Sequence, residues 1–221
     1  MGKDGIHLGA KVRWRDIEDD ARLRTAHPLL AAAITQVAHY QIRNRGTVGG
    51  NLAHADPAAE MPGVAVACDA DLTLTGSTGT RVVRAADFFL GPLSTLLACD
   101  EIIVEVRLPA WPAGRRWGFE EFARRRGDFA VAGIAVFYDR DARGIARNTH
   151  IGVIGACHRP HRLAGAEAAL NGRVVDEQAI LAAAIVAAAD VNPPADLHAS
   201  AKYRRALVGT LLERALIRAS E

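Results

Sequence analysis

The first third of the chain shows one strand pattern and two helical patterns. Residues 6–10 alternate in the way typical of a short strand. Pro28 stands where a helix can begin, and apolar residues recur behind it at helical spacing as far as Tyr40. A second helix is predicted over residues 56–67, with Asp56 as its N-cap.

Strand patterns return after residue 70. Residues 71–75 and 80–84 predict a hairpin around a Gly-Ser-Thr-Gly turn, and residues 101–108 alternate well enough for a further strand. Pro112 and Gly114 then interrupt the pattern. They mark the best candidate for a boundary between two parts of the chain.

The second part combines strands with a run of helices. Three strands, which we expect to be antiparallel, are predicted over residues 117–123, 130–138 and 150–156. Helical spacing follows over residues 163–170, 176–189 and 201–219. The whole pattern predicts an α+β protein in two parts, residues 1–110 and residues 111–221.

Residues 41–56 are rich in Gly, Asn and His and follow neither pattern. The glycine pair at 49–50 permits positive φ angles and a close approach of a ligand, and successive N–H groups in such a turn can bind an anion. Thr47 and Asn51 add side-chain donors, and Asp56 can bind the hydroxyls of a sugar alcohol. The segment predicts a site for phosphate or a polar ring, but a plain glycine turn between two helices is the alternative. It matches neither the phosphate loop of nucleoside triphosphatases nor the dinucleotide fingerprint.

Charge and cysteine content exclude several classes of protein. The formal net charge is only +2, whereas nucleic-acid binders usually show a strongly basic face. No apolar run is long enough to cross a bilayer. The three cysteines, Cys68, Cys99 and Cys157, lie far apart and fit reduced thiols in the cytoplasm. They are also too few to hold an iron–sulfur cluster without another chain.

Two other groups of residues are weak candidates for chemistry. His158 and His161 have no acid nearby, so we predict no metal site. Glu120 and Glu121 are neighbours on a predicted strand and therefore point to opposite faces. They cannot converge on one substrate, and we assign no catalytic residue to this chain.

A longer motif is more specific than any single residue within it. Residues 42–51 read Ile-Arg-Asn-Arg-Gly-Thr-Val-Gly-Gly-Asn, and residues 54–60 read His-Ala-Asp-Pro-Ala-Ala-Glu. This stretch closely resembles the second flavin loop of the medium, FAD-binding subunits of the xanthine dehydrogenase and carbon monoxide dehydrogenase family. Shorter landmarks of the family follow in the same order at residues 87–91, 100–103, 126–130, 164–167 and 203–205. The resemblance covers essentially the whole chain.

The resemblance implies a fold and a set of cofactor contacts. It implies a partial FAD-binding domain over 1–110, with a mixed sheet and flanking helices, and a flavoprotein C-terminal domain over 111–221. The residues that match the family's contacts are Thr47, Val48, Gly49, Gly50 and Asn51, with Asp56 near the flavin or its ribityl chain and Ile103 near the isoalloxazine ring. A lysine common at the flavin carbonyl edge is replaced here by Ala123, so Arg124 is the candidate for that charge.

One part of the family's pattern does not occur in this sequence. Relatives usually begin with a further subdomain, in which an Ala-Gly-Gly-x-Ser loop grips the pyrophosphate. A fragment, a late start codon or a second chain that supplies this half would each account for the difference. We expect FAD held by one loop to bind more weakly than FAD held by two.

The resemblance also implies a role. The chain would be the FAD-binding electron-transfer subunit of a molybdenum-containing hydroxylase or dehydrogenase, an oxidoreductase subunit that is not itself catalytic toward the organic substrate. Electrons would arrive from [2Fe–2S] clusters on a small partner subunit and leave to an external acceptor, while a large partner subunit carries molybdopterin. The alternatives are a truncated or degenerate scaffold that docks without flavin, and a stand-alone flavoprotein oxidase, for which the sequence offers no substrate-binding residues.

Overall fold

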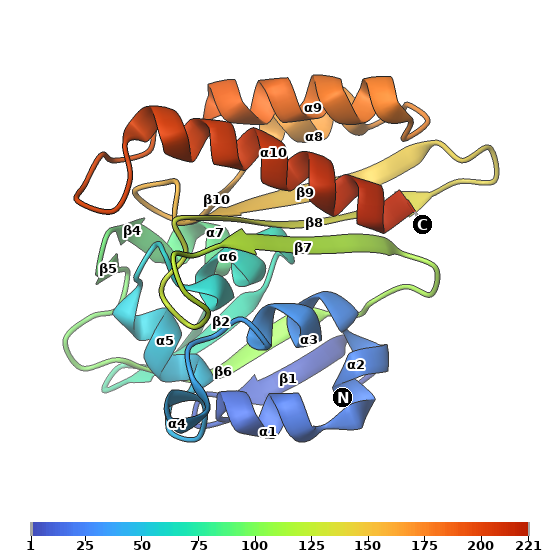
Figure 1. Ribbon diagram of the computed structural model, residues 1–221. Helices are drawn as coiled ribbons and strands as arrows, with labels where there is room; N and C mark the ends of the chain where they lie inside the picture. The colour runs from blue at the N-terminus through green and yellow to red at the C-terminus, as the bar shows by residue number, and fades with distance from the viewer. Residues whose placement is uncertain (1, 221) are drawn as a thin grey trace.

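Alternating apolar residues build the first sheet, which lies in the lower half of Figure 1. Ile6 and Leu8 point from its first strand into the core and pair with Leu108 and Val106 of a neighbouring strand. The structure is a computed structural model and describes residues 2–220. In spatial order the strands are β1 (Gly5–Gly9), β6 (Ile102–Pro109), β2 (Asp71–Gly76) and β3 (Gly79–Arg84).

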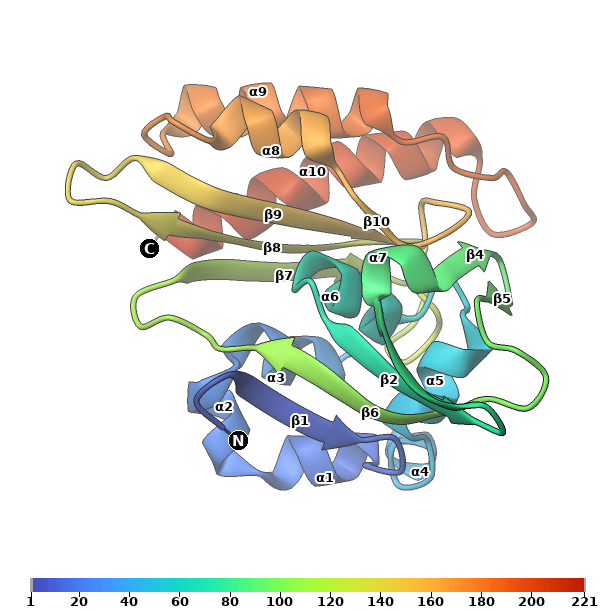
Figure 2. The same ribbon diagram turned by 180° about the vertical axis from the view of Figure 1, so that it is seen from behind.

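The predicted strands and the β2–β3 hairpin of this part are confirmed. The sheet is antiparallel rather than mixed as predicted, since each of its three pairings is antiparallel. β1 and β2 do run in the same direction, but β6 lies between them and pairs with both. Figure 2 shows this order from behind.

The predicted helix over residues 28–40 is too long. α3 (Pro28–Ile34) ends six residues earlier, because the Thr35 hydroxyl donates to the carbonyl of Ala32 at 2.7 Å and Ala38 has a φ of 44°. Two helices before it were not predicted, α1 (Trp14–Asp19) and α2 (Ala21–Ala26).

The segment over residues 41–56 is mostly helical, which corrects the prediction of an irregular loop. It contains α4 (Tyr40–Arg43) and α5 (Val48–His54). The next helix, α6 (Glu60–Ala67), begins four residues later than predicted. Ala55 takes a left-handed conformation, with a φ of 54°, and ends α5, while Asp56 accepts the amide of Ala58 instead of capping α6.

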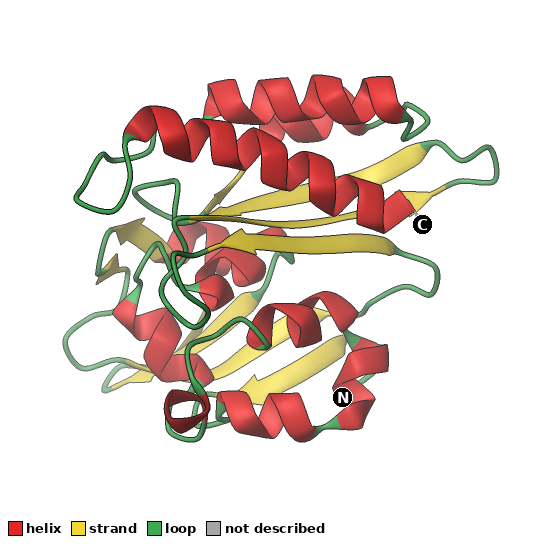
Figure 3. Ribbon diagram, viewed as in Figure 1, coloured by secondary structure: helices red, strands yellow, loops and turns green. Residues whose placement is uncertain are grey.

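α6 is buried along its whole length and lies between the two sheets of the molecule (Figure 3). Apart from Glu60, its residues are apolar or glycine, which allows neighbours to pack on every side. It packs against α3 and α5 of the first part and against the second sheet. A short aromatic segment completes the first part as α7 (Ala85–Phe88), β4 (Phe89–Gly91) and β5 (Ser94–Thr95).

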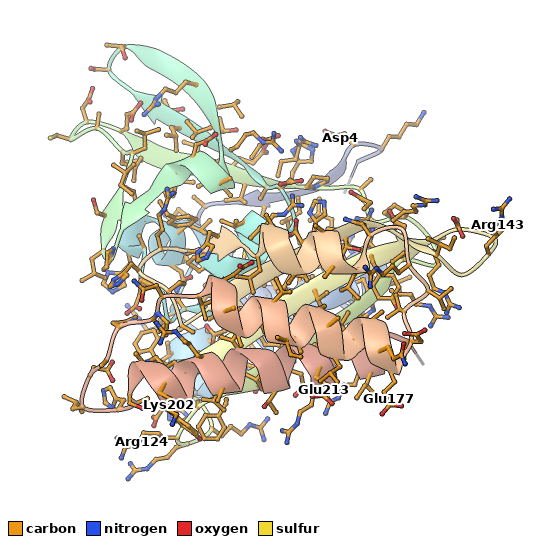
Figure 4. All side chains as sticks on the ribbon, turned by 90° about the horizontal axis from the view of Figure 1, so that it is seen from above. Asp4, Arg124, Arg143, Glu177, Lys202 and Glu213 are labelled. Carbon is orange, nitrogen blue, oxygen red and sulfur yellow. The ribbon has the colours of Figure 1, made fainter. Side chains whose placement is uncertain are left out.

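The three predicted strands of the second part are confirmed and antiparallel. They are β7 (Arg116–Phe122), β8 (Ala132–Arg140) and β9 (Ala146–Ile154), with the two-residue strand β10 (His161–Arg162) at the edge. The predicted helices are also confirmed, as α8 (Ala164–Leu170), α9 (Glu177–Asp190) and α10 (Ala201–Ser220). These helices cover the outer face of the sheet, and Figure 4 shows them from above.

The apolar core runs continuously from one part of the chain to the other. Phe119, Phe137 and Ile154 of the second sheet pack in the same buried cluster as the first sheet and α6. His150 adds a polar link, with Nδ1 at 2.7 Å from the carbonyl oxygen of Ala67. The two parts are therefore firmly joined, and a division near residue 110 remains a proposal.

Candidate cofactor site

The start of α5 carries the glycine pair and is bonded to the turn that follows β1. The amide of Val48 donates to the carbonyl of Val12, and that of Gly49 donates to Ala10, both at 2.9 Å. Thr47 is the N-cap, and its hydroxyl accepts the amide of Gly50 at 3.2 Å.

These contacts correct the expected role of the backbone. The amide of Asn51 also donates within the chain, to the carbonyl of Thr47 at 3.0 Å, so all four amides of residues 48–51 have partners. Gly49 and Gly50 have no positive φ angle. The predicted concave turn with free N–H groups is therefore not formed. Instead, the side chains of Thr47 and Asn51 and the Cα of Gly50 line the cavity described below.

Gly49 is required by a close contact. A Cβ atom there would lie 2.5 Å from Cβ of Ala10 and 3.0 Å from its carbonyl oxygen. We expect Gly49→Ala to push α5 away from the turn that follows β1 and to lower the free energy of unfolding by about 1–3 kcal/mol. Chemical denaturation measures this loss. Gly91→Ala is the matched control, because a Cβ there meets no atom within 4 Å. Equal stability of the two variants would contradict this explanation.

The predicted residues that face a common space are Thr47, Gly50 and Asn51. They line a cavity of about 420 Å³, here called the first cavity, together with Ile42, Glu60 and Phe129. Asn51 lines this cavity, and its Oδ1 is buried and has no hydrogen-bond donor within the described residues. A buried acceptor without a donor is costly. The ring N–H or a ribityl hydroxyl of a flavin would satisfy it, so the residues present fit such a group.

Glu60 is the functional candidate to which sequence reasoning gave no role. It is the first residue of α6, it lines the first cavity, and only 4% of its surface is exposed. Burial raises its pKa to about 7, an effect that Asp56 strengthens and that a hydrogen bond from its own backbone opposes. The one sign of this role in the sequence is a single acidic residue at the start of an otherwise apolar helix.

Asp56 and Arg124 lie apart from the first group. Both line a second cavity of about 760 Å³, which shares Ile42, Gly127, Asp128 and Phe129 with the first cavity. Nη1 of Arg124 donates to Nδ1 of His198 at 3.2 Å. Figure 4 shows Arg124 at the end of the molecule where α10 begins. The two cavities adjoin at Phe129, whose side chain is 61% exposed.

The remaining predicted residues have supporting positions. Val48 and Gly49 are the first two residues of α5, and both are buried. Ile103 is 7% exposed, lies in the core and pairs with Leu74 across β6 and β2. Ile103 lines neither cavity, so the structure does not bring it together with Asn51 or Asp56.

Two further properties concern the described chain as a whole. Within residues 2–220 no group of three or more His, Cys, Asp or Glu side chains is arranged to hold a metal ion. None of the helices over these residues is both long and apolar enough to cross a membrane.

Comparisons with known proteins agree with the geometry. Residues 1–111 match the FAD binding domain in molybdopterin dehydrogenase, and residues 117–219 match the CO dehydrogenase flavoprotein C-terminal domain. The nicotine 6-hydroxylase medium subunit of Paenarthrobacter nicotinovorans is 38% identical over 98% of this chain and 75% of its own length. The carbon monoxide dehydrogenase medium chain of Hydrogenophaga pseudoflava is 35% identical over 96% of this chain and 73% of its own length.

Solved structures are equally similar. Carbon monoxide dehydrogenase from Hydrogenophaga pseudoflava has a chain that superposes with a TM-score of 0.95 at 37% identity, covering 100% of this chain and 76% of that one. Quinoline 2-oxidoreductase from Pseudomonas putida 86 gives a TM-score of 0.93 at 33% identity, with the same coverage. The protein therefore belongs to the FAD-binding medium subunits of the molybdenum hydroxylase family and is an oxidoreductase subunit.

Proposed function

We propose that this chain holds FAD as an electron relay, taking electrons from iron–sulfur clusters on a partner subunit and passing them to an external acceptor. The observation that carries the proposal is the first cavity, which Asn51 and Glu60 both line, together with the buried Oδ1 of Asn51 that lacks a hydrogen-bond donor. Membership of a family of FAD-binding subunits supports FAD as the group that supplies the donor.

The proposed site uses both cavities. Asn51 and Glu60 would bind polar edges of the cofactor, and Thr47, whose hydroxyl accepts the amide of Gly50, lines the same cavity. Asp56 would accept hydroxyl groups in the second cavity, and the guanidinium of Arg124 would balance negative charge there. Val48 and Gly49, buried in α5, would keep Thr47 and Asn51 in place, whereas Ile103 packs in the core outside both cavities. When bound, FAD supplies the electron chemistry, and the protein supplies position and electrostatics.

The proposed partners follow from the same role. A small subunit would carry the [2Fe–2S] clusters and a large subunit the molybdopterin, where the organic substrate reacts. In this chain Cys68 and Cys157 are buried free thiols, and Cys99 is an exposed one. Burial raises the pKa of both Cys68 and Cys157 to about 12, so neither is poised to react. We also propose a cytoplasmic location, which suits free thiols.

A flavin titration tests the site. Asn51→Ala removes the buried acceptor, so we expect the Kd for FAD to rise roughly five- to tenfold, followed by quenching of flavin fluorescence. Gln36→Ala, at an exposed position after α3, is the matched control and should bind FAD like the parent chain. Equal affinities of the two variants would remove Asn51 from the site.

The second candidate function is a scaffold that docks without flavin. It is favoured by the start of α5, where the amides that could bind an anion already have partners in the chain. The absorbance spectrum of the purified complex with its partner subunits separates the two functions. Flavin bands that appear with added FAD and stay after desalting support the relay, and their absence supports the scaffold.

A further inference from the structure

Two loops meet at the wall of the second cavity. Residues 123–131 join β7 to β8 and include Arg124. Residues 191–200 join α9 to α10 and include His198. Nη1 of Arg124 and Nδ1 of His198 lie 3.2 Å apart, and both residues line the second cavity. Figure 4 shows Arg124 and Lys202 of α10 at the same end of the molecule. The contact therefore joins two loops that are distant in the sequence at the place where the cofactor is proposed to bind.

The chemistry of this contact fixes the state of the imidazole. A guanidinium has only N–H donors, so Nδ1 of His198 accepts the hydrogen bond from Arg124. The imidazole in this contact is therefore neutral and carries its proton on Nε2. Together the two side chains offer donors to a ligand and no free acceptor. Such a pair suits a ligand that presents oxygen acceptors, such as phosphate or carbonyl groups.

His198 is held in place by hydrogen bonds that reach the second sheet. Oδ1 of Asp196 accepts the amide of His198 at 2.9 Å. Oδ2 of Asp196 accepts Nη2 of the buried Arg204 at 2.7 Å. Nη1 of Arg204 donates to the carbonyls of Val131, just before β8, and Gly155, just after β9. All of these residues line the second cavity, so the chain of contacts forms one continuous part of its wall.

Arg124 has no carboxylate partner that would hold it instead. Its side chain is exposed, and no ion pair among the described residues includes it. Asp56 and Asp128 line the same cavity without pairing with Arg124, and Asp196 is engaged by Arg204. Ordering a long arginine side chain costs rotamer entropy, and a ligand must offset this cost unless another contact has already ordered the side chain. His198 provides such a contact.

We propose that His198 is a positioning residue that holds the guanidinium of Arg124 at the wall of the second cavity, where Arg124 binds an oxygen acceptor of FAD. The proposal rests on the proposed FAD site. It adds to that site a residue of the loop between α9 and α10, a segment to which the sequence gave no role. The oxygen acceptor belongs to the diphosphate or to a ring carbonyl of the flavin, and the measurements below distinguish these two sources.

The first measurement needs no cofactor. Nitrogen-15 NMR of the flavin-free chain at about pH 8, where imidazoles are ordinarily neutral, should show Nδ1 of His198 as a hydrogen-bonded acceptor. The signal is assigned by its loss in His198→Asn. Arg124→Ala should shift it toward the position of a free acceptor. Arg125→Ala, at the neighbouring exposed arginine, is the matched control and should leave it unchanged. A signal that does not respond to Arg124→Ala would overturn the proposal.

The second measurement is the Kd for FAD. In His198→Leu the cofactor itself must order the guanidinium of Arg124, so we expect the Kd to rise about three- to tenfold. His198→Asn should stay near the parent value, because its side-chain oxygen can take the place of Nδ1 as the acceptor. His161→Leu is the matched control and should bind FAD like the parent chain, since His161 lines neither cavity. Circular dichroism checks that each variant is folded.

A double-mutant cycle separates positioning from an independent effect of His198. Arg124→Ala should raise the Kd for FAD at least as much as His198→Leu does. Adding His198→Leu to Arg124→Ala should then cause little further rise, because the residue that His198 holds is already gone. A full additional rise in the double variant would show that His198 acts without Arg124 and would overturn the proposal.

Riboflavin, which lacks the diphosphate, identifies the oxygen that Arg124 binds. If this oxygen belongs to the diphosphate, His198→Leu and Arg124→Ala should weaken the binding of FAD and leave that of riboflavin unchanged. If it belongs to a ring carbonyl, both variants should weaken the two ligands alike.

The outcomes separate the positioning role from the proposed function. Equal FAD affinities of the parent chain and His198→Leu overturn the role of His198 and leave the proposed function intact. If the NMR contact is present but the parent chain in its complex binds no FAD, the cofactor site is overturned and, with it, the role of His198 there.

Discussion

Replacing Arg204 by alanine is expected to lower the free energy of unfolding by about 3–5 kcal/mol, because a buried carbonyl left without a donor costs about 1–3 kcal/mol and the variant leaves two. It also breaks an ion pair with Asp196, whose side chain is 40% exposed. Only 4% of Arg204 is exposed. Its Nη1 donates to the carbonyls of Val131 and Gly155 at 2.6 and 2.9 Å, and its Nη2 donates to Asp196 at 2.7 Å. The variant leaves two carbonyls and a carboxylate without this donor, and chemical denaturation measures the loss.

The neighbouring arginine provides the control. Arg205 contacts the carbonyl of Val191 and the side chain of Asn192, both at 3.2 Å, from a more exposed position. Arg205→Ala should therefore cost about 1 kcal/mol or less. If Arg204→Ala lowers the free energy of unfolding no more than Arg205→Ala does, the buried guanidinium does not contribute substantially to holding α10 against the β-sheet.

Gly118→Ala is expected to have the second large effect. A Cβ atom at Gly118 would lie 2.1 Å from the carbonyl oxygen of Ala215 and 2.8 Å from its carbonyl carbon. The obstacle is helix backbone, so no side-chain rotation can relieve it, and α10 must move away from β7. We expect the free energy of unfolding to fall by about 3 kcal/mol, near the upper end of typical overpacking costs.

Gly9→Ala is the matched control for this variant. Gly9 is also a strand glycine, but a Cβ there meets no atom within 4 Å. Thermal unfolding of both variants should show a markedly lower Tm for Gly118→Ala alone. A similar Tm for the two would mean that α10 accommodates the methyl group by a small shift.

The two halves of the chain differ in how much of the fold could be predicted from sequence. In the second half, long strands and helices carry strong periodicity, and every predicted element is present. In the first half, α1 and α2 were not predicted, and α3 was predicted too long. These helices have only six or seven residues each, too few for a periodic pattern to outweigh local contacts such as those of Thr35 and Ala38.

The candidate site shows the same division between local and distant effects. Its chemistry could be recognised at Thr47, Asn51 and Asp56, whose side chains suit a polar ligand. The reason for Gly49 was different from the predicted one, because it is the approach of Ala10 and not a positive φ that requires glycine. Such a contact joins residues far apart in the chain, and periodicity carries no information about it.

The amino-acid sequence by itself determined the α+β class, the longer helices and strands of the second part, and the membership of a FAD-binding family through one long motif. Only the tertiary structure decided that Asn51 and Glu60 line one cavity and that Asp56 and Arg124 line its neighbour. The physical reason is that burial and charge act through space. The pKa of a carboxyl depends on which groups surround it after folding, and a strand pattern specifies a face but not what packs against it.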